Sequence, residues 1–164
     1  MIEVGHMAAF LALAASMVQA WYGLRGNRAM AAGMAFSAFG MMSLSFGLLI
    51  WSFVSSDFSV ALVSAHSHTF KPLVYKIAGT WGNHEGSMAL WCLVSIGFAS
   101  AGAWRLKTGR SEFEARALGV QGAVSFGSLA YLLFASNPFL RLDVAPLQGS
   151  GLNPVLQDLS LIHI

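Results

Sequence analysis

The sequence predicts an all-α, polytopic integral membrane protein with about four transmembrane helices. Of its 164 residues, 56% are hydrophobic and only 10% are charged, whereas roughly 25% of the residues in a typical soluble domain are charged. The charged residues also leave four long uncharged stretches of sequence. Each has the ~20 apolar residues that cross a bilayer as a helix. Hydrocarbon offers no hydrogen-bond partner to the backbone, so each stretch is predicted to be helical.

The charged residues also set the limits of each predicted helix. The spans begin and end beside Glu3, Arg25, Arg28, Asp57, Glu85, Arg105, Arg116 and Arg141. The four predicted helices cover residues 4–24, 30–54, 86–104 and 117–136. Aromatic residues that favour the membrane interface fall near the ends of these spans: Trp21, Tyr22, Trp51, Trp81 and Trp104.

The first helix has an alternative interpretation as a cleaved signal peptide. "VQA" at 18–20 suits a signal peptidase, but the leading "MIEVGH" has no Lys or Arg and carries an acid. A signal peptide begins with a positively charged region. We therefore predict that the first helix is retained.

Lysine and arginine predict the orientation. The 25–28 turn and the 105–116 loop together hold six of the nine basic residues, whereas segment 55–85 holds only Lys71 and Lys76. The positive-inside rule places the two basic loops in the cytoplasm. The N-terminus and segment 55–85 are then periplasmic.

Small residues predict close helix packing. Gly33 and Ser37, and then Gly119, Ala123 and Gly127, recur four residues apart, a spacing that lets helix backbones approach each other in lipid. The single cysteine, Cys92, has no internal disulfide partner and is expected to pack as a small hydrophobe.

The stretch "WGNHEGSMALW" at 81–91 precedes the third helix and has two interpretations. In the structural one, Asn83 caps the helix, Glu85 lies at its second position beside the positive end of the helix dipole, and Gly82 and Gly86 permit a tight turn. In the functional one, His84 is a ligand or proton carrier, with Glu85 as its partner.

Two further polar stretches are weaker signals. In "HSH", His66 and His68 lie on one face if the segment is extended and form a conceivable metal pair, with a solvated polar loop as the alternative. Lys71 and Lys76 suit an anionic group such as a propionate, or are ordinary surface charges. "GSGLNPVLQD" at 149–158 predicts a helix start, with the residues Asn153, Pro154, Gln157 and Asp158.

Three stretches of the sequence together resemble the CcmF family, the large haem-lyase subunit of bacterial cytochrome c maturation. They are "VYKIAGTWGNHEGSMALW", "LFASNPF" at 133–139 and "GLNPVLQD" at 151–158. The resemblance runs from the first helix to Asp158. It implies the start of a haem-handling domain, with motif residues Trp81, Gly82, His84, Glu85, Gly86, Ser87 and Trp91.

The resemblance implies a function in cytochrome c biogenesis, the covalent attachment of haem to the CxxCH motif of apocytochrome c at the periplasmic face of the inner membrane. The implied partners are apocytochrome c, a haem chaperone, thiol-reducing maturation subunits and the lipid bilayer; nucleic acid is not expected. The implied cofactor is haem, both a b-type haem and the substrate haem, whose family ligands and WWD segment are not in this chain. We therefore expect cofactor-binding roles for Trp81, His84, Glu85 and Trp91, and no catalytic or metal-ligating residue.

The full-length family resembles a thioether-forming enzyme, whereas this chain alone is expected to be inactive. A transporter or permease subunit is the alternative function, although transporters place their polar groups at mid-membrane. The expected divisions are 1–85, with two helices and a periplasmic loop, and 86–158, the start of the haem-handling domain.

Residues 159–164 are expected not to belong to the natural protein. After Asp158 the family continues with proline and glycine, where this chain has Leu159 and Ser160, and His163 falls one position early. "LSLIHI" is also encoded by CTG TCT CTT ATA CAC ATC, which looks like a transposase adapter, and such scars are excluded from fold reasoning. Amplifying the source gene across this junction tests the expectation, and genomic DNA that encodes Leu159 to Ile164 would overturn it.

Overall fold

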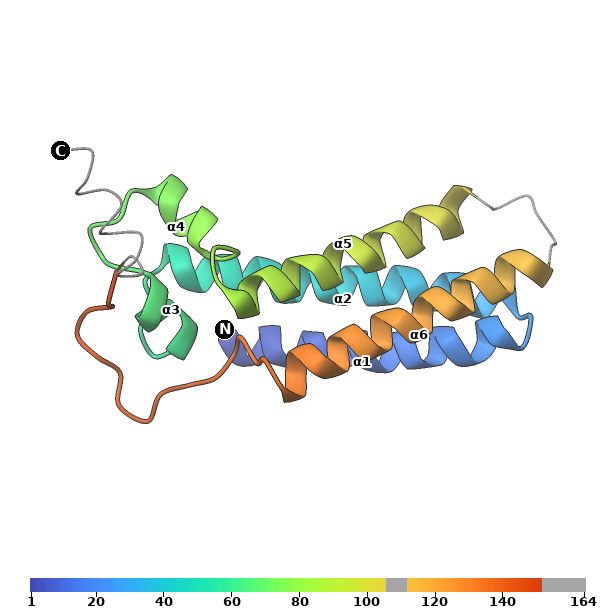
Figure 1. Cartoon of the computed structure of the whole chain (residues 1–164), viewed down its shortest axis with the longest axis horizontal. Coiled ribbons are helices and arrows are strands. Elements are labelled where there is room, and N and C mark those ends of the chain that lie inside the picture. The colour runs from blue at the N-terminus through green and yellow to red at the C-terminus, as the bar shows by residue number, and fades with distance from the viewer. Residues whose placement is uncertain (106–111, 152–164) are drawn as a thin grey trace.

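The computed structural model describes residues 1–105 and 112–151, and within these ranges it is all helix and loop (Figure 1). The four long helices are α1 (Ile2–Leu24), α2 (Arg28–Val54), α5 (His84–Arg105) and α6 (Glu112–Phe134). Each is long and apolar enough to span a membrane. The prediction of an all-α, four-span membrane protein is confirmed, and each helix begins a few residues earlier than predicted.

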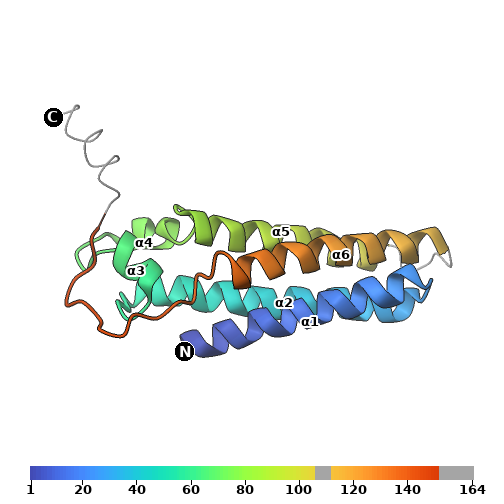
Figure 2. The same ribbon diagram turned by 60° about the horizontal axis from the view of Figure 1, so that its bottom comes forward.

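The long helices form one antiparallel bundle. α1 packs against α2 and α6, and α5 packs against the same two helices, as Figures 1 and 2 show from two directions. The turn between α1 and α2 is tight because Gly26 adopts a positive φ of 80°, which glycine tolerates without strain. Asn27 then caps α2, with its side chain accepting a hydrogen bond from Met30 N at 3.2 Å.

Buried residues, most of them small, line the inner face of the bundle at alternating spacings of three and four. On α1 this seam consists of Ile2, Gly5, Ala9, Ala12, Ser16, Gln19 and Gly23. On α2 it consists of Ala31, Ala35, Ala38, Met42, Ser45, Leu49 and Ser52. A repeat of this kind keeps one stripe facing a partner helix, and small side chains let backbones approach where lipid removes the hydrophobic drive for association.

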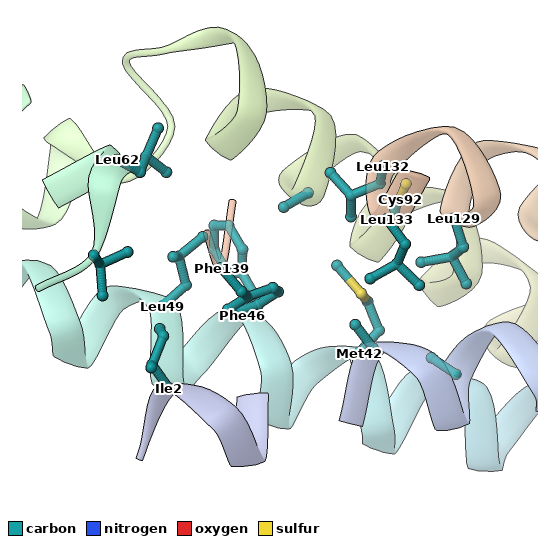
Figure 3. Packing of buried hydrophobic residues seen from close by; sticks show 14 of the residues in the cluster. Ile2, Met42, Phe46, Leu49, Leu62, Cys92, Leu129, Leu132, Leu133 and Phe139 are labelled. Atoms are coloured by element: carbon teal, nitrogen blue, oxygen red, sulfur yellow. The ribbon is translucent and has the colours of Figure 1, made fainter. Parts of the chain in front are cut away.

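Larger side chains fill the part of the bundle toward the end where the N-terminus of the chain lies. Met42, Phe46 and Leu49 of α2 belong to one buried cluster with Leu129, Leu132 and Leu133 of α6 and Cys92 of α5 (Figure 3). Cys92 is 2% exposed, so the expectation that it packs as a small hydrophobe is confirmed. Ile2, Leu62 and Phe139 extend the same cluster toward the end of the bundle.

The small-residue prediction is only partly correct. Gly119 does make a close contact, but with Gly23 of α1, which the sequence analysis did not select. Gly33 and Gly127 have no atom within 4 Å of a built Cβ, so they do not mediate packing within the described residues. Spacing identifies a face of small residues, but it does not identify which face meets another helix.

Two short helices fold over the end of the bundle opposite the α1–α2 turn. They are α3 (Ala61–His66) and α4 (Leu73–Gly79), and they lie beside the N-terminus in Figure 1. Backbone hydrogen bonds from Ala61 N to Leu140 O and from Leu142 N to Ser59 O, both 2.9 Å, tie α3 to the chain that follows α6.

The basic residues separate by end, as the positive-inside argument requires. Arg25, Arg28, Arg105 and Arg116 lie at the end with the α1–α2 turn, and Lys71, Lys76 and Arg141 belong to segments at the other. Lys107 and Arg110 lie outside the described residues. Arg28 Nε also meets Glu114 Oε2 at 3.2 Å, which joins the starts of α2 and α6.

The periplasmic orientation of the N-terminus remains a prediction with a direct test. In a Cys92→Ser background, Thr69→Cys should react with a membrane-impermeant maleimide added from the periplasmic side, because Thr69 is exposed beyond the end of the bundle. Phe113→Cys, 79% exposed at the basic end, should react only after the inner membrane is opened. The reverse labelling pattern would contradict the orientation.

Candidate functional site at the start of the third span

Asn83 caps α5 and connects it to α4. Its Oδ1 accepts a hydrogen bond from Gly86 N at 2.7 Å, while its Nδ2 donates to Gly79 O at 2.9 Å. The predicted cap is confirmed, and His84 and Glu85 occupy the first two helical positions. A carboxylate in this turn is favoured by the positive end of the helix dipole.

Gly86 is the residue that makes the tight turn possible. A Cβ at this position would overlap Thr80 O and lie 2.8 Å from Thr80 C and 2.9 Å from Asn83 Oδ1. At Gly82 the nearest atom to a built Cβ is Ala78 O, at an ordinary 3.5 Å. The steric requirement expected of both glycines therefore holds at Gly86 alone.

His84 and Trp91 lie on one outer face of α5. They are seven residues apart, which returns the helix to the same direction, and both are exposed, Trp91 by 70%. The imidazole of His84 makes no hydrogen bond within the described residues, whereas its backbone carbonyl accepts one from Ser87 Oγ at 2.9 Å. Trp81 is 40% exposed just before the helix begins.

Glu85 lines a pocket on another side of the helix start. The pocket has a volume of about 270 Å³. Its polar lining residues are His66, from α3, Glu85, and Asn137, from the loop after α6; the remaining lining residues are Ala61, Leu62, Ala65 and Leu140. His84 does not line this pocket, so only Glu85 of the two neighbouring residues faces it.

Asn137, which lines this pocket, also bonds to neighbouring parts of the chain. Its Oδ1 accepts a hydrogen bond from Phe139 N at 2.9 Å, which turns the amide NH₂ toward His6 Nε2 at 3.3 Å. Because the amide nitrogen donates, His6 Nε2 must accept, so His6 is neutral with its proton on Nδ1. The His6 ring also stacks on Phe139, with centroids 5.5 Å apart.

The sequence analysis did not select His6 and gave Asn137 only as part of "LFASNPF". The Asn-Pro pair was a usable turn signal. The contact itself joins residues 131 positions apart, and no local pattern encodes it.

The HSH stretch gives no metal centre within the described residues, where no three His, Cys, Asp or Glu side chains come together. His66 ends α3, with its Nδ1 3.1 Å from Leu62 O. Lys71 Nζ donates to His66 O at 3.0 Å, and burial lowers the pKa of Lys71. Lys76 Nζ donates to Ser56 Oγ at 2.6 Å. The predicted helix start at Asn153, Pro154, Gln157 and Asp158, and the tail 159–164, lie outside the described residues.

Curated relatives match the chain over nearly its whole length, although no protein-family model matches it. The cytochrome c-type biogenesis protein ccl1 of Rhodobacter capsulatus is 44% identical over 96% of this chain and 25% of its own length. CycK of Rhizobium meliloti is 42% identical over 99% of the chain and 25% of its own length. CcmF of Escherichia coli is 40% identical over 99% of the chain and 26% of its own length.

A solved structure has the same fold. A chain described as cytochrome c haem lyase CcmF aligns with 84% of this chain and 24% of its own, with a TM-score of 0.76 at 23% identity. The bundle of long apolar helices defines a polytopic helical membrane protein. The chain belongs to the CcmF family of cytochrome c-type biogenesis proteins. It spans about a quarter of the length of the curated relatives that it matches.

Proposed function

We propose that this chain forms part of a membrane protein that attaches haem covalently to apocytochrome c at the periplasmic face of the bacterial inner membrane. One observation carries the proposal: relatives named as cytochrome c-type biogenesis proteins match 96% or more of the chain at 40–44% identity. The same comparisons return no transporter among the relatives described, so the permease alternative is not favoured.

The exposed face at the start of α5 fits one side of a haem. An imidazole is an iron ligand, and an indole offers a flat apolar surface for a porphyrin. His84 and Trp91 present these groups on one face, with neither side chain buried in the bundle. We assign His84, Trp91 and Trp81 to contact with substrate haem. Glu85 belongs to the separate pocket, with a structural part in the helix start.

The other partners in this proposal come from the family. They are apocytochrome c, a haem chaperone and thiol-reducing subunits of the same system. The ligands of a resident b-type haem are assigned to the part of the relatives that this chain does not match. On this view the haem-handling domain starts at residue 86, in the first turn of α5, and residues 1–85 supply two spans and the periplasmic segment.

Site variants test the assignment in a chimaera, in which residues 1–151 replace the matching region of a curated relative. His84→Ala and Trp91→Ala should each lower the yield of holocytochrome c by about two- to tenfold, because a stacking or hydrogen-bonding contact contributes about 0.5–1.5 kcal/mol. Haem staining and the Soret absorbance of the purified chimaera measure this.

Phe98→Ala is the matched control, since Phe98 lies seven residues beyond Trp91 on the same face and is 74% exposed. It should mature cytochrome c normally. Equal yields from all three variants would remove the haem-contact assignment and leave the family membership intact.

A further inference from the structure

The pocket beside Glu85 has an unusual balance of hydrogen-bonding groups. The carboxylate of Glu85 has no hydrogen bond or ion pair within the described residues, although it is half-buried. His66 Nδ1 faces Leu62 O at 3.1 Å, and because a carbonyl only accepts, Nδ1 carries the proton. In the neutral tautomer that carries its proton on Nδ1, Nε2 is an acceptor. Both unused groups therefore need a donor.

The other residues that line the pocket indicate what kind of donor fits it. Ala61, Leu62, Ala65 and Leu140 give aliphatic walls, and the volume of about 270 Å³ is several times the ~30 Å³ that one water occupies in the liquid. A half-buried carboxylate favours a positive partner. Aliphatic walls favour an apolar stem that carries the charge at its tip, as in lysine and arginine.

The lysines near this end do not supply the cation. Lys71 Nζ is bonded to His66 O and Lys76 Nζ to Ser56 Oγ. Neither forms an ion pair with Glu85, since the ion pairs of the described residues involve Glu3, Glu112 and Glu114. A metal ion is a poor fit, because no third carboxylate, imidazole or thiol joins Glu85 and His66 in the described residues.

We propose that this pocket between α3, the start of α5 and the loop after α6 binds the ammonium or guanidinium group of a lysine or arginine side chain from a polypeptide. Glu85 accepts hydrogen bonds from the charged group, His66 Nε2 accepts another, and the aliphatic walls hold the stem. Asn137 fixes the floor through its bonds to His6 and Phe139. The inference does not depend on the proposed haem chemistry, because it concerns binding at a pocket that His84 and Trp91 do not line.

Carboxylate footprinting of the full chain in detergent tests it, with n-butylguanidinium as the probe. Carbodiimide and glycine ethyl ester should label Glu85, and millimolar probe should slow that labelling about fivefold or more, because hydrogen bonds between charged groups are strong. Labelling of Glu112, which has a 70% exposed side chain at the other end of the bundle, is the internal control and should not change. Peptide mass spectrometry reads both sites in one sample.

Variants and neutral or inorganic probes separate the explanations. His66→Phe should raise the probe concentration that protects Glu85 by about tenfold, because one acceptor is lost. Lys71→Met should leave that concentration unchanged. Protection by n-butanol, equal protection by Ca²⁺, equal protection of Glu112, or no protection at all would each overturn the proposal. None of these outcomes bears on cytochrome c maturation, so the two proposals can fail separately.

Discussion

Replacing Gly119 with alanine is expected to separate α1 from α6 and to destabilise the bundle strongly. A Cβ there would lie 2.5 Å from Leu24 N and 2.7 Å from Gly23 C, and one on Gly23 would lie 2.5 Å from Gly119 N and 2.8 Å from Ala115 O. These obstacles are backbone atoms, so no side chain can rotate away. Overpacking of this kind costs about 1–3 kcal/mol, occasionally more.

Separation would also break a buried polar contact one turn away. Gln19 is fully buried, and its Nε2 donates to Leu118 O at 2.8 Å. A buried amide that loses its partner retains its desolvation cost of about 1–3 kcal/mol. We therefore expect both Gly23→Ala and Gly119→Ala to lower the apparent Tm in detergent by several degrees, at about 2–4 °C per kcal/mol.

Gly127→Ala is the control on the same helix, since a Cβ at Gly127 meets nothing within 4 Å. Alanine is the better helix former by about 1 kcal/mol, so this variant should be neutral or slightly more stable. Equal apparent Tm values for Gly119→Ala and Gly127→Ala would contradict the close crossing of α1 and α6.

Gly86→Ala is expected to disrupt the start of α5. The new methyl group would overlap Thr80 O and approach Asn83 Oδ1 to 2.9 Å, so the α4–α5 turn and the cap would have to move together. Loss of the cap adds about 0.5–2 kcal/mol to the steric cost. The same movement would shift Trp81, His84 and Glu85, so we expect loss of both stability and cytochrome c maturation in the chimaera.

Gly82→Ala is the matched substitution in the same motif. Its Cβ would meet no atom nearer than 3.5 Å, so stability and maturation should stay close to those of the parent. Equal loss from both substitutions would mean that the backbone flexibility of the motif matters and that the contact between Gly86 and Thr80 does not.

The membrane spans were predictable because the local composition of the sequence marks each of them. A charge cannot lie in hydrocarbon without a large cost, so the gaps between charges mark helices α1, α2, α5 and α6 directly. The Asn83 cap was predictable for a similar reason, because a cap bonds to the backbone three residues away.

The arrangement of the site was less predictable, because it depends on contacts between distant segments. The approach of Gly23 to Gly119 and the bond between His6 and Asn137 join the start of the chain to α6 and to the loop after it. Glu85 and His84 are neighbours in sequence, yet a helix turns by about 100° per residue. The sequence alone therefore did not show that only Glu85 would face the pocket with His66.

The most direct measurement is complementation by the chimaera that carries residues 1–151 of this chain in place of the matching quarter of a curated relative. In a strain that lacks that relative, the chimaera should restore haem-stained holocytochrome c, and the 164-residue chain alone should not. A chimaera that is inserted and folded in the membrane but yields no holocytochrome c would contradict the proposed role in haem attachment.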